Sequence, residues 1–224
     1  AYVRSGGTWT HTKNGNSDLG YGVYATVAGD LVVESGGLVT AKGKGYNGAC
    51  GPGKSVAAGH GGSHGARFLS GAAPSYGSVF TPTLLGSGGY YYSTAGGRVR
   101  LEVGGAAAIA GEIDVDGEYG AYSHCTGGSI LLACGALTGS GWVHAHGAYV
   151  SVGCGGRVAV KQSRATDFAA FTGRISACGG TQLATIGGIP AAPAGTVYLQ
   201  SAGAAANAGT VYVRDDTPVH SMLH

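Results

Sequence analysis

The heptapeptide "GEIDVDG" (111–117) is one of four related stretches that decide the predicted fold. All four have the form G-x-(I/V)-x-(A/V)-x-G, and the others are "GLVTAKG" (37–43), "GWVHAHG" (141–147) and "GRISACG" (173–179). Because side chains alternate between two faces of an extended chain, each copy would place aliphatic residues on one face and polar residues on the other. Such a recurring motif indicates a repeat architecture.

A second element alternates with the heptapeptides and consists of a glycine followed by a strand-like run. Its clearest copies are "GRVRLEV" (97–103), "GSILLAC" (128–134), "GRVAVKQ" (156–162) and "GTVYLQ" (195–200). The first three of these copies begin 31 and 28 residues apart, a spacing typical of folds that stack short strands. The aliphatic residues expected to face inward are Val99, Leu101, Val103, Ile130, Leu132, Cys134, Val158, Val160, Val197 and Leu199.

These two patterns predict an all-β fold, a single-domain right-handed parallel β-helix (β-solenoid) over residues 1–224. Residues 1–28 would form a strand-like N-terminal segment. Residues 44–96 break the rhythm and would form a long glycine-rich lateral loop. The alternative, an antiparallel β-sandwich, requires tight hairpin signals between neighbouring strands, and the Asn-Gly and Asp-Gly pairs do not lie between two clear strands.

The composition limits the classes of function. Of 224 residues, 46 are glycine, 44% are hydrophobic, only 11% are charged, and the net charge is +2. A disordered chain would combine low hydrophobicity with high charge, and a nucleic-acid partner would require a more basic chain. No apolar run reaches the roughly 20 residues of a membrane-spanning helix. Low charge with abundant Gly, Ser and Tyr favours an extracellular or cell-surface location.

The succession "GGRVRLEV", "GEIDVDG", "GGSILLACGALTGSG" and "GGRVAV" resembles the glycine-rich β-solenoid repeats of very large secreted bacterial surface proteins. The resemblance covers roughly residues 29–214. It implies the same fold and an extracellular location, and it implies no catalytic residue.

Stacking the four heptapeptides in register would align their polar side chains in columns. The first column is Thr40, Asp114, His144 and Ser176, and the second is Lys42, Asp116, His146 and Cys178. Neighbouring strands lie about 4.8 Å apart, so four of these residues would form one exposed patch: Asp114, Asp116, His144 and His146.

This patch has three interpretations. It could bind a divalent metal, or supply acid and base groups that act on a glycan, or stabilise the sheet through cross-strand pairs of unlike charge. The third interpretation is favoured, because the columns show no residues that would orient metal ligands. The sequence therefore predicts no cofactor apart from a divalent metal at this patch.

Three aromatic residues are expected on the outer surface, where they could stack against sugars or another chain: Trp142, Tyr198 and Tyr212. Tyr198 and Tyr212 would stack on each other from successive repeats. Cys125 and Cys154 each precede a glycine-led strand of consecutive repeats, so their Cα atoms would lie within disulfide range. The motif HExxH (a zinc protease) does not occur. The sequence predicts no catalytic residue and does not favour an enzyme.

The sequence thus predicts an extracellular structural or adhesive module that assembles with other copies of itself, including head-to-tail assembly into filaments. The alternative is a carbohydrate-binding or carbohydrate-processing β-helix that uses the Asp/His patch. The expected partners are other copies of the chain and glycans, with no nucleic acid and no membrane span.

Overall fold

A computed structural model describes residues 1–55, 60–67, 73–90, 93–118, 124–148, 152–180 and 192–213. Over these ranges the chain forms fifteen strands in three sheets and no helix. Accordingly, this part of the chain contains no helix with the length and apolarity to cross a membrane.

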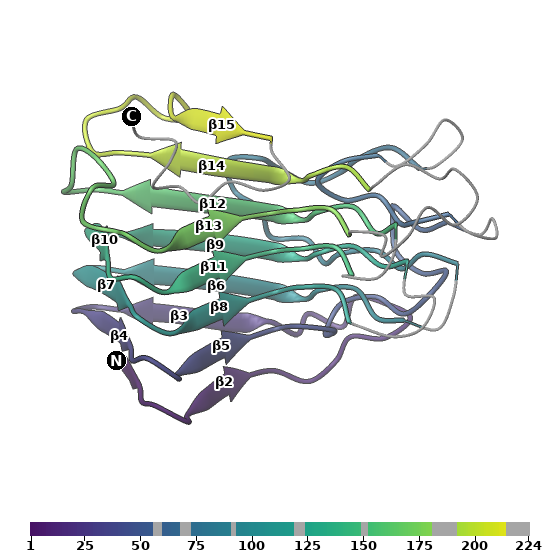
Figure 1. The fold of residues 1–224 in the computed structure, drawn as a ribbon, viewed down its shortest axis with the longest axis horizontal. Coiled ribbons are helices and arrows are strands. Elements are labelled where there is room, and N and C mark those ends of the chain that lie inside the picture. Colours follow the sequence, from purple (N-terminus) through teal and green to yellow (C-terminus); the bar gives the residue numbers. More distant parts are fainter. Residues whose placement is uncertain are drawn as a thin grey trace.

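The strands stack in chain order, from the N-terminal strands at the bottom of Figure 1 to the C-terminal strands at the top. The four-stranded sheet contains β1 (Tyr2–Val3), β4 (Leu31–Val33), β7 (Ala106–Ile109) and β10 (Ala136–Thr138). The five-stranded sheet contains β2 (Thr8–Thr10), β5 (Leu38–Thr40), β8 (Glu112–Asp114), β11 (Trp142–His144) and β13 (Arg174–Ser176). The six-stranded sheet contains β3 (Val23–Val27), β6 (Arg98–Val103), β9 (Ser129–Cys134), β12 (Arg157–Gln162), β14 (Thr196–Gln200) and β15 (Thr210–Tyr212).

The predicted fold class, a single right-handed parallel β-helix, is wrong. The strands belong to three separate sheets, which are mostly parallel, and the last strand, β15, pairs antiparallel with β14. The repeat predicts which strands are neighbours, because the same two-faced pattern recurs in each copy. It does not predict how the strands divide into sheets, since the glycine-rich turns between them carry no side-chain signal.

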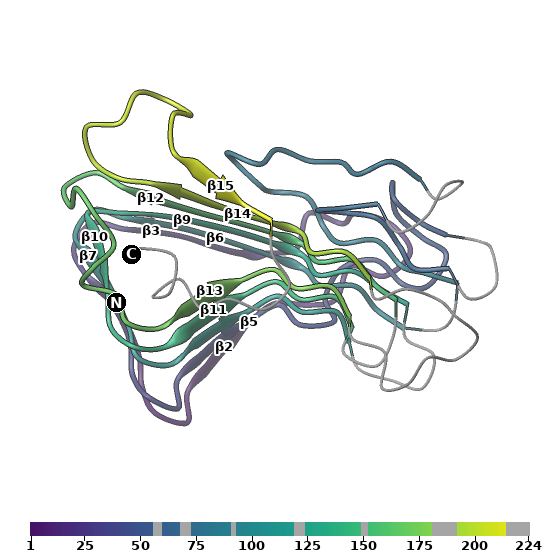
Figure 2. The same ribbon diagram turned by 45° about the horizontal axis from the view of Figure 1, so that its top comes forward.

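The segment 44–96, which was predicted to be a long lateral loop, contains no strand among its described residues. Its described residues hydrogen-bond through the backbone to other glycine-rich connections beside the sheets (Figure 2). The Gly62 N–H donates to the carbonyl of His124, and the Gly65 N–H donates to the carbonyl of Gly155. The segment is therefore part of a layer held together by its backbone, which side-chain patterns cannot reveal.

The predicted stacking of the four heptapeptides is confirmed. Val39, Ile113, Val143 and Ile175 are paired in register on four adjacent parallel strands, β5, β8, β11 and β13. All four side chains are buried. The aliphatic residues that were expected to face inward from the glycine-led runs join them in one core cluster.

Close backbone contact between neighbouring segments explains why certain positions require glycine. A Cβ atom on Gly128 would lie 1.9 Å from the carbonyl oxygen of Gly97. That oxygen accepts a hydrogen bond from the N–H of Ser129, so it cannot move without disturbing the pairing of β6 with β9. Gly29 differs, because nothing lies within 4 Å of the Cβ that would be added there.

We predict that Gly128→Ala lowers the free energy of unfolding by about 1–3 kcal/mol or more, because the added methyl group overlaps backbone. Gly29→Ala, the matched control, should change it by no more than about 0.5 kcal/mol. Urea unfolding followed by circular dichroism measures both. Equal midpoints for the two variants would show that the backbone contact at Gly128 can relax.

Candidate metal centre

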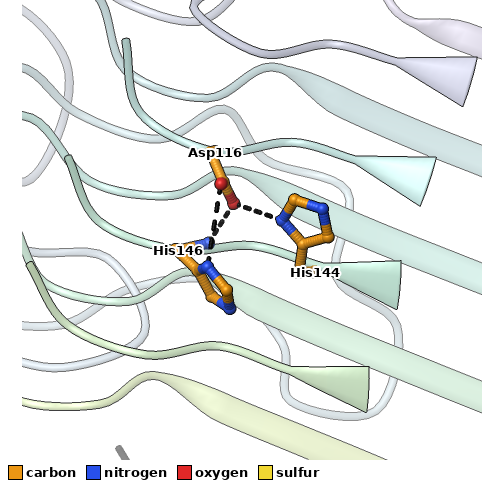
Figure 3. A group of neighbouring side chains, drawn as sticks. All are labelled: Asp116, His144 and His146. Carbon is orange, nitrogen blue, oxygen red and sulfur yellow. Dashed lines mark hydrogen bonds and ion pairs between the residues drawn. The ribbon is translucent and has the colours of Figure 1, made fainter. Parts of the chain in front are cut away.

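The candidate site lies where β8 and β11 end in the five-stranded sheet. Asp114, the last residue of β8, is in register with His144, the last residue of β11. The pairing continues beyond both strands, because the N–H of Val115 donates to the carbonyl of His144 and that of Gly117 to the carbonyl of His146. This continued pairing brings Asp116 beside both histidines (Figure 3).

His144 is held between two carboxylates. Its Nδ1 lies 2.8 Å from Oδ1 of Asp116 and its Nε2 lies 2.6 Å from Oε1 of Glu112, with only 3% of the side chain exposed. Burial opposes the charged form, but the hydrogen bonds to Asp116 and Glu112 and the nearby carboxylate charges outweigh it and raise the pKa of His144 to about 9. The ring is therefore an imidazolium that donates from both nitrogens at neutral pH.

His146 has the opposite protonation. Its Nε2 lies 2.7 Å from Oγ of Ser176, and its Nδ1 faces Oδ2 of Asp116 at 3.7 Å. Burial is the main cause that lowers the pKa of His146 to about 4, and the charge of His144 adds to it. A neutral ring therefore lies on the other side of the Asp116 carboxylate from the charged one.

The carboxylates of the cluster differ in their pKa values. Burial and the charge of Asp116 raise the pKa of Asp114 to about 6. Burial also opposes ionisation of Asp116, but the hydrogen bond to His144, the charge of His144 and the hydrogen bond from the backbone N–H of His146 lower its pKa. Hydrogen bonding to His144 lowers the pKa of Glu112. Lys42, whose Nζ lies 3.9 Å from Oδ2 of Asp114, adds a positive charge at the edge of the cluster.

Within the described ranges, two groups of side chains could hold a metal ion. One consists of Asp116, His144 and His146, and the other of Glu112, Asp114 and His144. In each group the three potential ligand atoms lie within 4.8 Å of one another. The predicted Asp/His patch is thus a cluster of possible metal ligands.

The structure corrects the expectation that this patch is exposed, because Asp114 and His144 are buried. Trp142 packs on His144, with 4.3 Å between the ring centroids, and its Nε1 donates to Oγ of Ser176 at 3.2 Å. Sequence reasoning placed Trp142 on the outer face, which is correct. It did not foresee that the indole would fold over its neighbour two residues along the same strand.

Sequence reasoning also missed Glu112, and it missed the role of Ser176; both residues orient the histidines. Glu112 lies two residues before Asp114, so the alternation of the strand places both on the same face. Ser176 was in the predicted column, but its role depends on its distance to His146 and Trp142 across the strands.

Two of the predicted stacking aromatics do not stack. Tyr198 is fully buried, in T-shaped contact with Phe80 at 5.1 Å between ring centroids. Tyr212 pairs with Val197 because β15 runs antiparallel to β14, and it packs against the core. The prediction assumed a parallel last strand and a bare sheet face, and neither is present.

The predicted Cys125–Cys154 disulfide is not present, since both residues are thiols. The Cys125 thiol donates to the carbonyl of Glu118 at 3.6 Å and packs against Ala95 and Ala148. Cys154 lies in a different buried cluster. Similar positions along the sequence therefore do not bring the two sulfur atoms together.

We predict that stability falls as pH rises from about 7 to 8.5, in the presence of EDTA, because of His144. Its pKa is about 9 in the folded protein against 6.5 as the ordinary value, so the folded state binds more protons in this window. A shift of this size corresponds to about 3 kcal/mol across its full range. Urea unfolding at several pH values measures the slope.

His144→Gln is the control for this pH dependence, because it removes the titrating ring and keeps a hydrogen-bonding side chain. It should lower stability at pH 7 and abolish most of the slope. A parent protein whose stability is constant over this window would contradict the assignment of a charged His144.

Comparison of the chain with models of protein families, with curated proteins and with solved structures found no match. The resemblance to glycine-rich repeats of bacterial surface proteins therefore stays a prediction.

Proposed function

We propose that the chain binds a divalent metal ion, zinc by its donor set, through Asp116, His144 and His146. One observation carries the proposal: the Nδ1 atoms of two histidines face the two oxygens of a single carboxylate, at 2.8 and 3.7 Å (Figure 3). Zinc takes imidazole nitrogen and carboxylate oxygen in tetrahedral geometry. Calcium requires six to eight oxygen ligands, which these three residues do not offer.

The outer hydrogen bonds of both rings support coordination through Nδ1. Nε2 of His144 is bonded to Glu112, and Nε2 of His146 is bonded to Ser176. A metal-ligating histidine almost always donates its other ring N–H to an acceptor that orients the ring. Three protein ligands leave a fourth position open to water or to a group from a partner.

Metal binding at this site must displace a proton. In the metal-free protein, Nδ1 of His144 donates a hydrogen bond to Asp116. A metal ion that coordinates this nitrogen takes the place of that proton, which leaves to solvent. The carboxylates that balance the imidazolium charge then balance the charge of the metal.

We predict that zinc chloride binds with a stoichiometry of one and releases about one proton at neutral pH. Titration calorimetry in two buffers of different ionisation enthalpy measures both quantities. The double variant Asp116→Ala, His146→Ala should lose the binding, and His60→Ala, a histidine outside the cluster, should keep it. Absence of binding heat in the parent protein would leave the cluster with a structural role only.

A second proposal, that the chain is a structural module that pairs with other copies, is supported by the edge formed by β1, β2 and β3. In the part of the chain that is described, each of these strands pairs on one side only. They lie together at the lower end of the stack in Figure 1, and Tyr2 and Tyr24 are exposed there. Edge strands present unpaired N–H and C=O groups that invite another strand. The extracellular location remains a prediction.

We predict that the parent protein associates in a concentration-dependent manner, and that Thr8→Lys combined with Tyr24→Lys shifts it towards monomer, because charges on an edge strand discourage pairing. The control, Ala108→Lys, lies on β7, which has partners on both sides. Sedimentation velocity measures the association. A parent protein that sediments as monomer at every concentration would contradict assembly through this edge.

A further inference from the structure

A groove of about 630 Å³ lies where four adjacent strands of the five-stranded sheet begin. It is lined by residues 36–38, 110–112, 140–142 and 172–174, which lead into β5, β8, β11 and β13. Because neighbouring strands are about 4.8 Å apart, the groove extends over roughly 14 Å across these strands. That length suits a short oligosaccharide better than a single small molecule.

The groove exists because glycine precedes each of the four strands, at Gly37, Gly111, Gly141 and Gly173. A Cβ atom on Gly111 would lie 2.2 Å from the carbonyl oxygen of Gly37, and one on Gly141 would lie 2.1 Å from that of Gly111. Side chains cannot be accommodated at these positions. Part of the lining is therefore bare backbone, bordered by the side chains of the residues that follow.

Three of those following residues form a row across adjacent strands, with Glu112 and Arg174 each in register with Trp142. Trp142 is 37% exposed and its rotamer is held in two ways, by ring contact with His144 and by donation to Ser176. The side chain of Glu112 is 40% exposed and Arg174 is exposed. The groove therefore contains a fixed indole with a carboxylate on one side and a guanidinium on the other.

We propose that this groove binds an oligosaccharide, with one pyranose ring stacked on Trp142 and its hydroxyl groups bonded to Glu112 and Arg174. The indole offers an apolar face for the C–H groups of the sugar. The carboxylate accepts and the guanidinium donates, which together satisfy hydroxyl groups on both sides of the ring. The carboxylate disfavours a polyanionic ligand. Neither Trp142 nor Arg174 is a ligand in the proposed zinc site, but Glu112 orients the proposed ligand His144. Sugar binding is therefore tested both without and with zinc.

The experiment uses the two tryptophans of the chain, Trp9 and Trp142. A Trp9→Phe variant leaves Trp142 as the only indole, and its fluorescence is titrated with cellohexaose, chitohexaose, laminarihexaose and mannohexaose in the presence of EDTA. A saturable change with at least one sugar is expected. The same titration with zinc keeps the test separate from the metal proposal.

Variants of the parent chain then locate the site by calorimetry with the sugar that binds. Trp142→Ala and Arg174→Ala should each weaken binding by about tenfold or more. Arg100→Ala, which removes an exposed arginine from the six-stranded sheet, should not. Arg174 is exposed, so its variant remains informative if Trp142→Ala does not fold. No saturable change with any sugar, or parental affinity in both groove variants, would overturn the proposal.

Discussion

Backbone hydrogen bonding between successive passes of the chain is the interaction on which the rest of this structure depends. It aligns the heptapeptides and, beyond the ends of β8 and β11, it continues through Val115 and Gly117 to the carbonyls of His144 and His146. That continuation places Asp116 between the two rings. The geometry of the candidate metal centre is therefore a consequence of strand register.

Within this register, charge compensation determines what the cluster can do. The imidazolium of His144 is buried, and burying a charge is unfavourable unless a partner is close. Asp116 and Glu112 provide that partner on both sides of the ring. The same arrangement suits a proton or a metal cation, since both are positive charges held between the same oxygens.

The sequence predicts the register of neighbouring strands well, and it predicts the division of the strands into sheets poorly. The in-register heptapeptides follow from their alternation, and so does the proximity of Asp114 and Asp116 to the histidines. The division into three sheets, the antiparallel β15 and the buried position of Tyr198 depend on glycine-rich segments whose contacts are made by backbone. A glycine permits a close backbone contact, but the sequence identifies neither which glycines make one nor which segment they contact.

The backbone contacts at Gly37, Gly111 and Gly141 have a further consequence for how this surface could change in evolution. A side chain at these positions would overlap neighbouring backbone, whereas the side chains of Trp142 and Arg174 in the same lining are exposed. Substitution is therefore more restricted at the glycines than at the exposed positions of this lining. The exposed side chains can vary one strand at a time while the close backbone contacts between strands are kept.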